Sequence, residues 1–84
     1  MPYSLRDQPE SIEDVIVHLG FEVRSVRYAQ LDTQSALSER AGVSQSTWSM
    51  LENGLAEGIR LETLSRVAVA LGYDLVLRRC DHPD

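Results

Sequence analysis

The 84-residue sequence contains one cysteine, no lysine and no long apolar run. A single cysteine, Cys80, cannot form an internal disulfide bond, which excludes a disulfide framework and favours a reducing compartment. No segment approaches the ~18 consecutive apolar residues that a membrane-spanning helix needs. Residues 1–10 (MPYSLRDQPE) do not have the charged and then apolar order of a signal peptide. We therefore expect a soluble, cytoplasmic protein with no membrane contact.

The charge balance is acidic, with eight arginines against thirteen acidic residues and a net charge of -5. Proteins that coat nucleic acid without sequence preference are normally basic, so the balance argues against that class. Three of the arginines and six of the acids lie in residues 1–32, which therefore carry -3. A local binding face for nucleic acid elsewhere is compatible with this charge, but long-range attraction of phosphate should be weak.

Patterns typical of catalysis or of metal binding are also missing. The sequence has no Gly-rich phosphate loop and no nucleophile, base and orienting group at usable spacing. Cys80, Asp81 and His82 lie together near the C-terminus, but His18 is the only other imidazole and the ligand set is incomplete. We expect no enzyme, no metal and no other cofactor.

The spacing of apolar residues in steps of three and four predicts four helices. Ser11, Thr33 and Ser44 can cap the first three, while Gly42 and Gly72 can end the second and fourth. The expected spans, with their capping residues, are 11–30, 33–42, 44–53 and 61–72, and the third helix is expected to stop at Gly54. A glycine at position 20 makes a kink or break the main alternative for the first helix.

The spacing of apolar residues changes in the segment YDLVLRR, after the fourth helix. Leu75 and Leu77 alternate with Asp74 and Val76, which is typical of a short strand. A lone strand has no partner in a helical chain. We expect it to pair with the same strand of a second copy across a two-fold axis, through Leu75, Val76 and Leu77. The alternatives are an extension of the fourth helix or a packed tail.

The expected fold is thus all-α, a compact helix-turn-helix bundle of four to five helices with a short C-terminal β-strand for dimerisation. It divides the chain into a flexible arm at residues 1–10, a DNA-binding domain at 11–73, and a strand and tail at 74–84.

Residues 33–54 (TQSALSERAGVSQSTWSMLENG) have the composition of a helix-turn-helix motif. Such a motif needs a small residue where the helices touch, a glycine at the turn and apolar anchors on both sides. Ser38 and Gly42 fill the first two roles, and the anchors are Leu37, Val43, Trp48 and Leu51. With these positions assigned, four short polar residues have nothing to pack against: Gln45, Ser46, Thr47 and Ser49.

This uncharged polar face is unusual for a solvated helix, which more often carries Glu, Lys or Arg. Glutamine and serine can hydrogen-bond to base edges, and they are short enough for the helix to enter the major groove. The face therefore favours a DNA-reading role over a purely solvated surface.

These residues resemble the helix-turn-helix of the phage repressor and Cro (XRE-type, lambda-repressor-like) superfamily. The Thr-Gln start, the Ala-Gly-Val-Ser turn and the Leu-Glu-Asn-Gly end are in register, and the likeness extends upstream to VRSVRYA and downstream to LETLSRVAVALG. The resemblance implies a bacterial or phage, nucleoid-associated regulator, acting as a repressor and homodimer on double-stranded DNA with a palindromic operator.

The resemblance also implies roles for individual residues. Arg27 and Glu52 would form an ion pair between the first and third helices. The expected DNA-binding residues are Gln34, Ser44, Gln45, Ser46, Thr47, Ser49, Asn53 and Arg60. Leu31-Asp32 stands where the family usually has Gly-Leu, Met50 where it often has a basic residue, and Glu57 where a basic residue would help.

The tail, ALGYDLVLRRCD, resembles the C-terminal strand of HipB-type antitoxins. This second resemblance implies an alternative function, an antitoxin that binds a toxin protein and represses its own operon. A third hypothesis is an adapter that uses the same fold without binding DNA.

Overall fold

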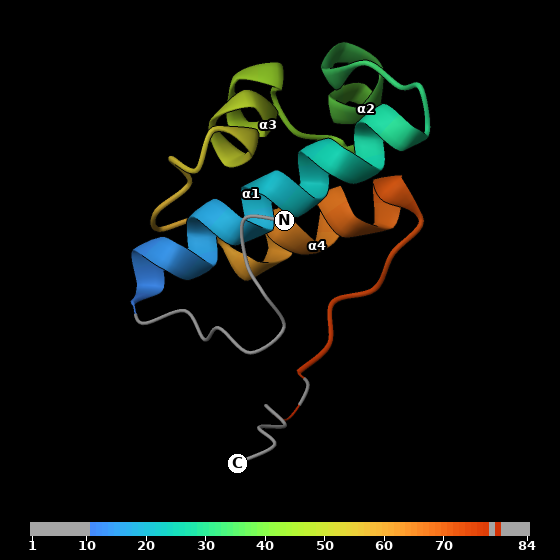
Figure 1. Cartoon of the computed structure of the whole chain (residues 1–84). Coiled ribbons are helices and arrows are strands. Elements are labelled where there is room, and N and C mark those ends of the chain that lie inside the picture. The colour runs from blue at the N-terminus through green and yellow to red at the C-terminus, as the bar shows by residue number, and fades with distance from the viewer. Residues whose placement is uncertain (1–10, 78, 80–84) are drawn as a thin grey trace.

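The computed structural model describes residues 11–77 and residue 79. In this part the chain forms α1 (Ile12–Ala29), α2 (Gln34–Ala41), α3 (Gln45–Glu52) and α4 (Leu61–Leu71). Figure 1 shows α2 and α3 above α1, with α4 behind it. The predicted all-α helix-turn-helix bundle is confirmed, and the helix ends agree with the expected spans once the capping residues are counted. Among the described helices, none is long and apolar enough to cross a membrane.

Three of the helices begin at the hydroxyl groups that the sequence offers as caps. Ser11 Oγ accepts a hydrogen bond from the Asp14 amide, and Thr33 Oγ1 accepts one from the Ala36 amide at 3.0 Å. Ser44 does the same for the third helix. Such caps satisfy backbone donors that a helix start leaves unpaired. The turn between α2 and α3 forms at Gly42, whose φ of 74° lies in the left-handed region that favours glycine.

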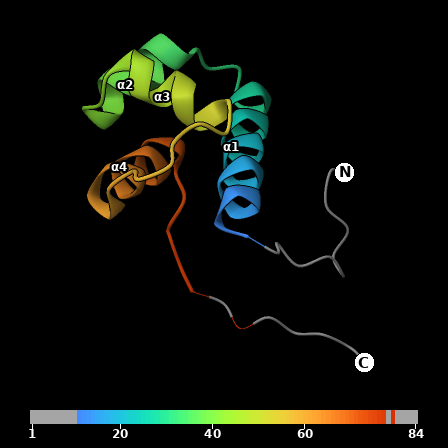
Figure 2. The same ribbon diagram turned by 90° about the vertical axis from the view of Figure 1, so that its left-hand side faces the viewer.

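Figure 2 shows α1 on one side of the bundle and α2, α3 and α4 on the other. All four helices contribute residues to the hydrophobic core. Its fully buried side chains come from three of the helices: Leu37, Trp48, Leu51 and Val67. The first three are among the four anchors expected of the helix-turn-helix motif, and the fourth, Val43, is partly buried against the core. Ser38, the expected small contact, is also buried. Packing therefore determines the orientation of α3 relative to the rest of the domain.

The kink considered at Gly20 does not form, and α1 is one continuous helix. Gly20 is buried where α1 crosses the last turn of α3. A Cβ atom at this position would overlap the Leu51 carbonyl oxygen and lie 3.3 Å from the Glu52 carbonyl carbon. The absence of a side chain at Gly20 therefore allows α1 and α3 to pack closely, and it does not break α1.

Leu31 has a φ of 60° and is 92% exposed. It is the non-glycine residue with positive φ among those described, and it stands where the resembled family usually has glycine. A left-handed conformation costs an L-residue roughly 1–2 kcal/mol. The chain thus makes this turn before α2 at some cost in conformational strain.

The predicted C-terminal strand is not seen. Residues 73–77 form neither strand nor helix and lead away from the bundle in both ribbon views. The physical reason is that the described residues contain no other strand with which Leu75, Val76 and Leu77 could form a ladder. The helical alternative is also wrong, because α4 ends at Leu71 with Gly72 in the left-handed conformation. The predicted arm at residues 1–10 and the Cys80, Asp81 and His82 cluster lie outside the described residues.

We predict that Gly20→Ala destabilises the protein by about 1–3 kcal/mol, because the added methyl group meets backbone that cannot move aside cheaply. Helix propensity alone would give a gain of about 1 kcal/mol. Urea denaturation measures the difference, with Ser25→Ala on the exposed side of α1 as the control that reports propensity alone. A stabilising Gly20→Ala variant would show that the two helices do not pack this closely.

Candidate nucleic-acid interface

The polar residues expected to read DNA lie on the face of α3 that points away from the core. Gln45 and Ser46 are exposed, while Thr47 and Ser49 are half-buried along the edges of this face. Trp48 and Leu51 are fully buried on the opposite face. The N-terminal half of α3 is thus anchored from behind and open to solvent in front.

The hydroxyl group of Ser44 forms two hydrogen bonds within its own chain. Its Oγ accepts from the Thr47 amide at 3.0 Å and donates to Thr47 Oγ1 at 2.9 Å. Since the Thr47 hydroxyl oxygen accepts this hydrogen bond, its own proton can be donated elsewhere. The structure thus assigns Ser44 a capping role and leaves Thr47 as the hydroxyl available to a phosphate.

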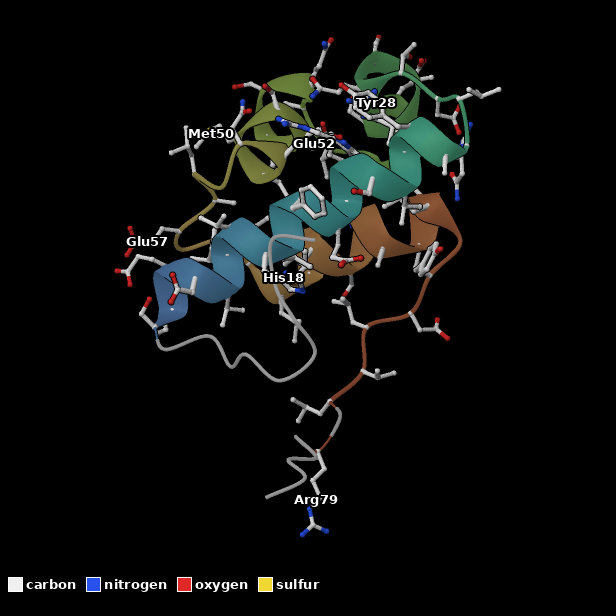
Figure 3. The ribbon with its side chains drawn as sticks, in the orientation of Figure 1. His18, Tyr28, Met50, Glu52, Glu57 and Arg79 are labelled. Atoms are coloured by element: carbon white, nitrogen blue, oxygen red, sulfur yellow. The ribbon has the colours of Figure 1, made fainter. Side chains whose placement is uncertain are left out.

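The carboxylate of Glu52 lies at the centre of the site, where Figure 3 shows it between α1 and α3. Its side chain is fully buried. Arg27 contacts it bidentately, with Nε 2.6 Å from Oε2 and Nη2 2.9 Å from Oε1. Gln34 Nε2 donates to Oε1 at 3.0 Å, and Trp48 Nε1 donates to Oε2 at 2.7 Å. One carboxylate therefore connects α1, α2 and α3.

These contacts determine the charge states of the pair. Burial of Glu52 opposes its ionisation, but the hydrogen bonds from Arg27, Gln34 and Trp48 outweigh it and lower the pKa of the carboxyl group. The hydrogen bonds that Arg27 donates to Glu52 in turn raise the pKa of the Arg27 guanidinium, against the effect of burial. Both groups are charged at neutral pH. The positive charge of Arg27 balances the negative charge of Glu52, so the pair adds no net charge to the surface that α3 presents to a ligand.

One of these contacts, that of Trp48, could not be predicted from the resemblance. Trp48 was assigned to the core, yet its indole N–H also binds Glu52 one helical turn away, a spacing at which side chains meet. The resemblance implies that Gln34 binds phosphate and also buttresses the third helix. Its amide nitrogen joins α2 to α3 at Glu52, in agreement with the second role, and its contact with phosphate stays a prediction. Arg24, which the sequence reasoning missed, donates to Asn53 Oδ1 at 2.8 Å.

A shallow hollow of about 260 Å³ flanks the C-terminal part of α3. Thr47 and Arg60 line it, as do Met50 and Glu57, which Figure 3 shows pointing outward at the same end of the molecule. Arg60 is exposed at the start of α4. The hollow thus groups a hydroxyl and a guanidinium, both suited to phosphate, beside one acid that would oppose it.

We predict that Glu52→Gln destabilises the protein by about 3 kcal/mol, because it leaves the buried Arg27 charge without its counter-charge. Urea denaturation checks this. The matched control is Glu62→Gln, which removes an equal charge from the exposed pair with Arg66 at 2.9 Å and should cost less than about 1 kcal/mol.

The same pair predicts a pH dependence. Because folding lowers the pKa of Glu52 below its ordinary value of 4.5, its contribution is fully present above that pH and is lost as the pH falls through the lower folded value. The difference in stability between wild type and Glu52→Gln should therefore shrink on acidification. Two results would contradict a charged, buried carboxylate. One is an equal loss of stability for Glu52→Gln and Glu62→Gln at pH 7, and the other is a stability difference between wild type and Glu52→Gln that does not change with pH.

Comparison with known proteins agrees with this geometry. Residues 23–77, more than half of the chain, match the family model described as helix-turn-helix. Searches of curated proteins and of solved structures returned no significant match. The match spans α2, the turn, α3 and α4, together with the part of α1 that carries Arg24 and Arg27. The chain therefore belongs to the XRE-type helix-turn-helix family of DNA-binding transcriptional regulators.

Proposed function

We propose that the protein is a transcriptional repressor that recognises a specific operator by inserting the N-terminal half of α3 into the major groove. The observation that carries this proposal is the exposure of Gln45 and Ser46 on a helix whose opposite face is fixed by Trp48 and Leu51. A rigidly held helix with short polar side chains at its tip can approach base edges closely.

The chemistry of this face determines what it can read. Gln45 can donate to N7 and accept from N6 of adenine, while Ser46 and Ser49 can each make a single hydrogen bond to a base. Contacts from Thr47, Asn53 and Arg60 to the sugar-phosphate backbone would fix the register without adding sequence information. The burial and pairing of Glu52 support this reading, because no free carboxylate on α3 would repel DNA.

Affinity for a single half-site should be modest. The chain carries a net charge of -5, and Glu57 lies beside Arg60 in the hollow next to α3. Few phosphate contacts mean a small gain from counterion release. Two linked half-sites overcome this limit, so we propose a homodimer on a palindromic operator with half-sites about one helical turn apart.

The segment after α4 supports dimerisation through the tail. Val76 is 78% exposed and its apolar neighbours Leu75 and Leu77 are also exposed, in a segment that leads away from the bundle. Pairing with the same segment of a second copy would satisfy its backbone groups and cover these side chains. The ribbon thus remains a proposal about the dimer.

An antitoxin is the second candidate. The helix α1 exposes Ile12, Val17 and Phe21, and its first turn carries the acidic residues Glu13 and Asp14. An apolar and acidic surface suits a basic partner protein, and it lies apart from the reading face of α3. Stoichiometric co-purification with the product of an adjacent gene would support this function, whereas isolation of the regulator alone under co-expression would argue against it.

We predict that Gln45→Ala weakens operator binding by roughly 1–3 kcal/mol and relaxes preference at one base position, with the fold unchanged. Fluorescence anisotropy on operator and single-substituted duplexes measures this, and circular dichroism checks the fold. Val69→Ala, on the exposed side of α4, is the control and should bind as wild type does. Unchanged binding by Gln45→Ala would remove this residue from recognition.

We predict that Val76→Pro converts the dimer into a monomer, because proline removes a backbone donor from the ribbon. Analytical ultracentrifugation reports the change, and Val76→Thr, which keeps the donor and a β-branched side chain, should remain dimeric. A dimer that persists with proline at this position would place the two-fold contact on the helices.

A further inference from the structure

A chain of side-chain contacts runs from α1 to the reading face of α3. Arg24 Nη2 donates to Asn53 Oδ1 at 2.8 Å, and Asn53 Nδ2 donates to Ser49 Oγ at 3.4 Å. Arg24 is itself held by Glu52, since its Nε lies 3.5 Å from Oε1 of that carboxylate. The buried centre of the site is therefore connected to an expected base-reading hydroxyl through two polar side chains.

The direction of these hydrogen bonds follows from the chemistry of the groups. A guanidinium has only donors, so the atom of Asn53 that faces Arg24 must be the carbonyl oxygen. The amide nitrogen of Asn53 then faces Ser49, and the Ser49 oxygen accepts from it. Within the described part of the chain the hydroxyl proton of Ser49 has no acceptor. It is left for a ligand in front of α3.

We infer that Arg24 is a specificity-determining positioning residue, which acts through Asn53 to make Ser49 a hydrogen-bond donor toward DNA. This inference rests on the proposed function and specifies what Ser49 reads. In the major groove a donor suits guanine O6 and N7 or thymine O4, whereas cytosine presents only its N4 amino donor. Ser49 therefore favours guanine or thymine over cytosine at the base that it contacts.

Binding selection from random duplexes tests this inference, with Ser49→Ala used to identify the base position whose preference depends on the hydroxyl. At that position wild type should enrich guanine or thymine over cytosine by about threefold to tenfold, the ratio expected for one net hydrogen bond. The Gln45-dependent position serves as an internal reference.

Asn53→Asp is the decisive variant. An aspartate keeps an acceptor for Arg24 but has no N–H, so the Ser49 hydroxyl would donate inward and present its lone pairs to DNA. The selected base should then shift toward cytosine or adenine, whose amino groups are donors. Overall affinity falls because of the added charge, but preference at other positions should not change.

Arg24→Met separates positioning from simple charge loss. It should reduce the preference at the Ser49 position alone, because the Asn53 amide is then free to turn. Arg40→Met removes an equal charge from the exposed end of α2, which has no contact with Asn53, and should leave all base preferences as in wild type. A direct phosphate contact by Arg24 would instead lower binding to all sequences alike and reduce the salt slope by about 0.9.

The outcomes are distinct. Selection of no sequence by the wild-type protein refutes the proposed function, and this inference with it. A wild-type motif that Ser49→Ala leaves unchanged, or a Ser49 position that keeps its base in both Asn53→Asp and Arg24→Met, overturns the inference and leaves the proposed function intact. If Arg24→Met does not fold by circular dichroism, Asn53→Asp decides alone.

Discussion

The buried carboxylate of Glu52 is the interaction on which the arrangement of the domain depends. It lies on α3 and accepts hydrogen bonds from Arg27 of α1, from Gln34 of α2 and from Trp48 of its own helix. A charge in this position costs desolvation, and paired donors offset that cost without making the site a large net source of stability. The benefit is geometric. The hydrogen-bond donors come from three helices, and all of them reach the carboxylate only in one relative placement of these helices. The helix α3 is thereby held at a defined angle by polar contacts as well as by the core.

Small residues make this network possible. At Gly20 the absence of a side chain lets α1 cross the last turn of α3, which is also the turn that carries Glu52. Ser38 is buried in the contact region of α2, and Gly42 turns the chain sharply into α3. Because Arg27 and Glu52 form hydrogen bonds of 2.6 and 2.9 Å only when α1 and α3 lie close, the steric and electrostatic constraints depend on each other. The polar tip of α3 projects from this rigid base.

Much of this architecture was predictable from sequence because the relevant signals are local. Capping hydroxyls, glycines at helix ends and apolar residues in steps of three and four depend on near neighbours in the chain, and they predicted all four helices. The role of Gly20 could not be predicted from such local signals, because it depends on backbone 31 residues away, at Leu51. The strand at Leu75, Val76 and Leu77 was expected from alternation alone, but a strand needs a partner that a single chain does not provide. Arg24 gave no signal, because its contact with Asn53 spans 29 residues and involves a side chain on the edge of α1.

The central claim is that the domain meets DNA with the N-terminal half of α3, held in place by the Glu52 network. The most direct measurement is an NMR titration of the labelled protein with a duplex that contains its selected site. The account predicts that the largest amide shift changes fall at residues 44–49, while the exposed side of α4 stays unchanged. Changes confined to α1 and α4, with residues 44–49 unaffected by the duplex, would contradict it.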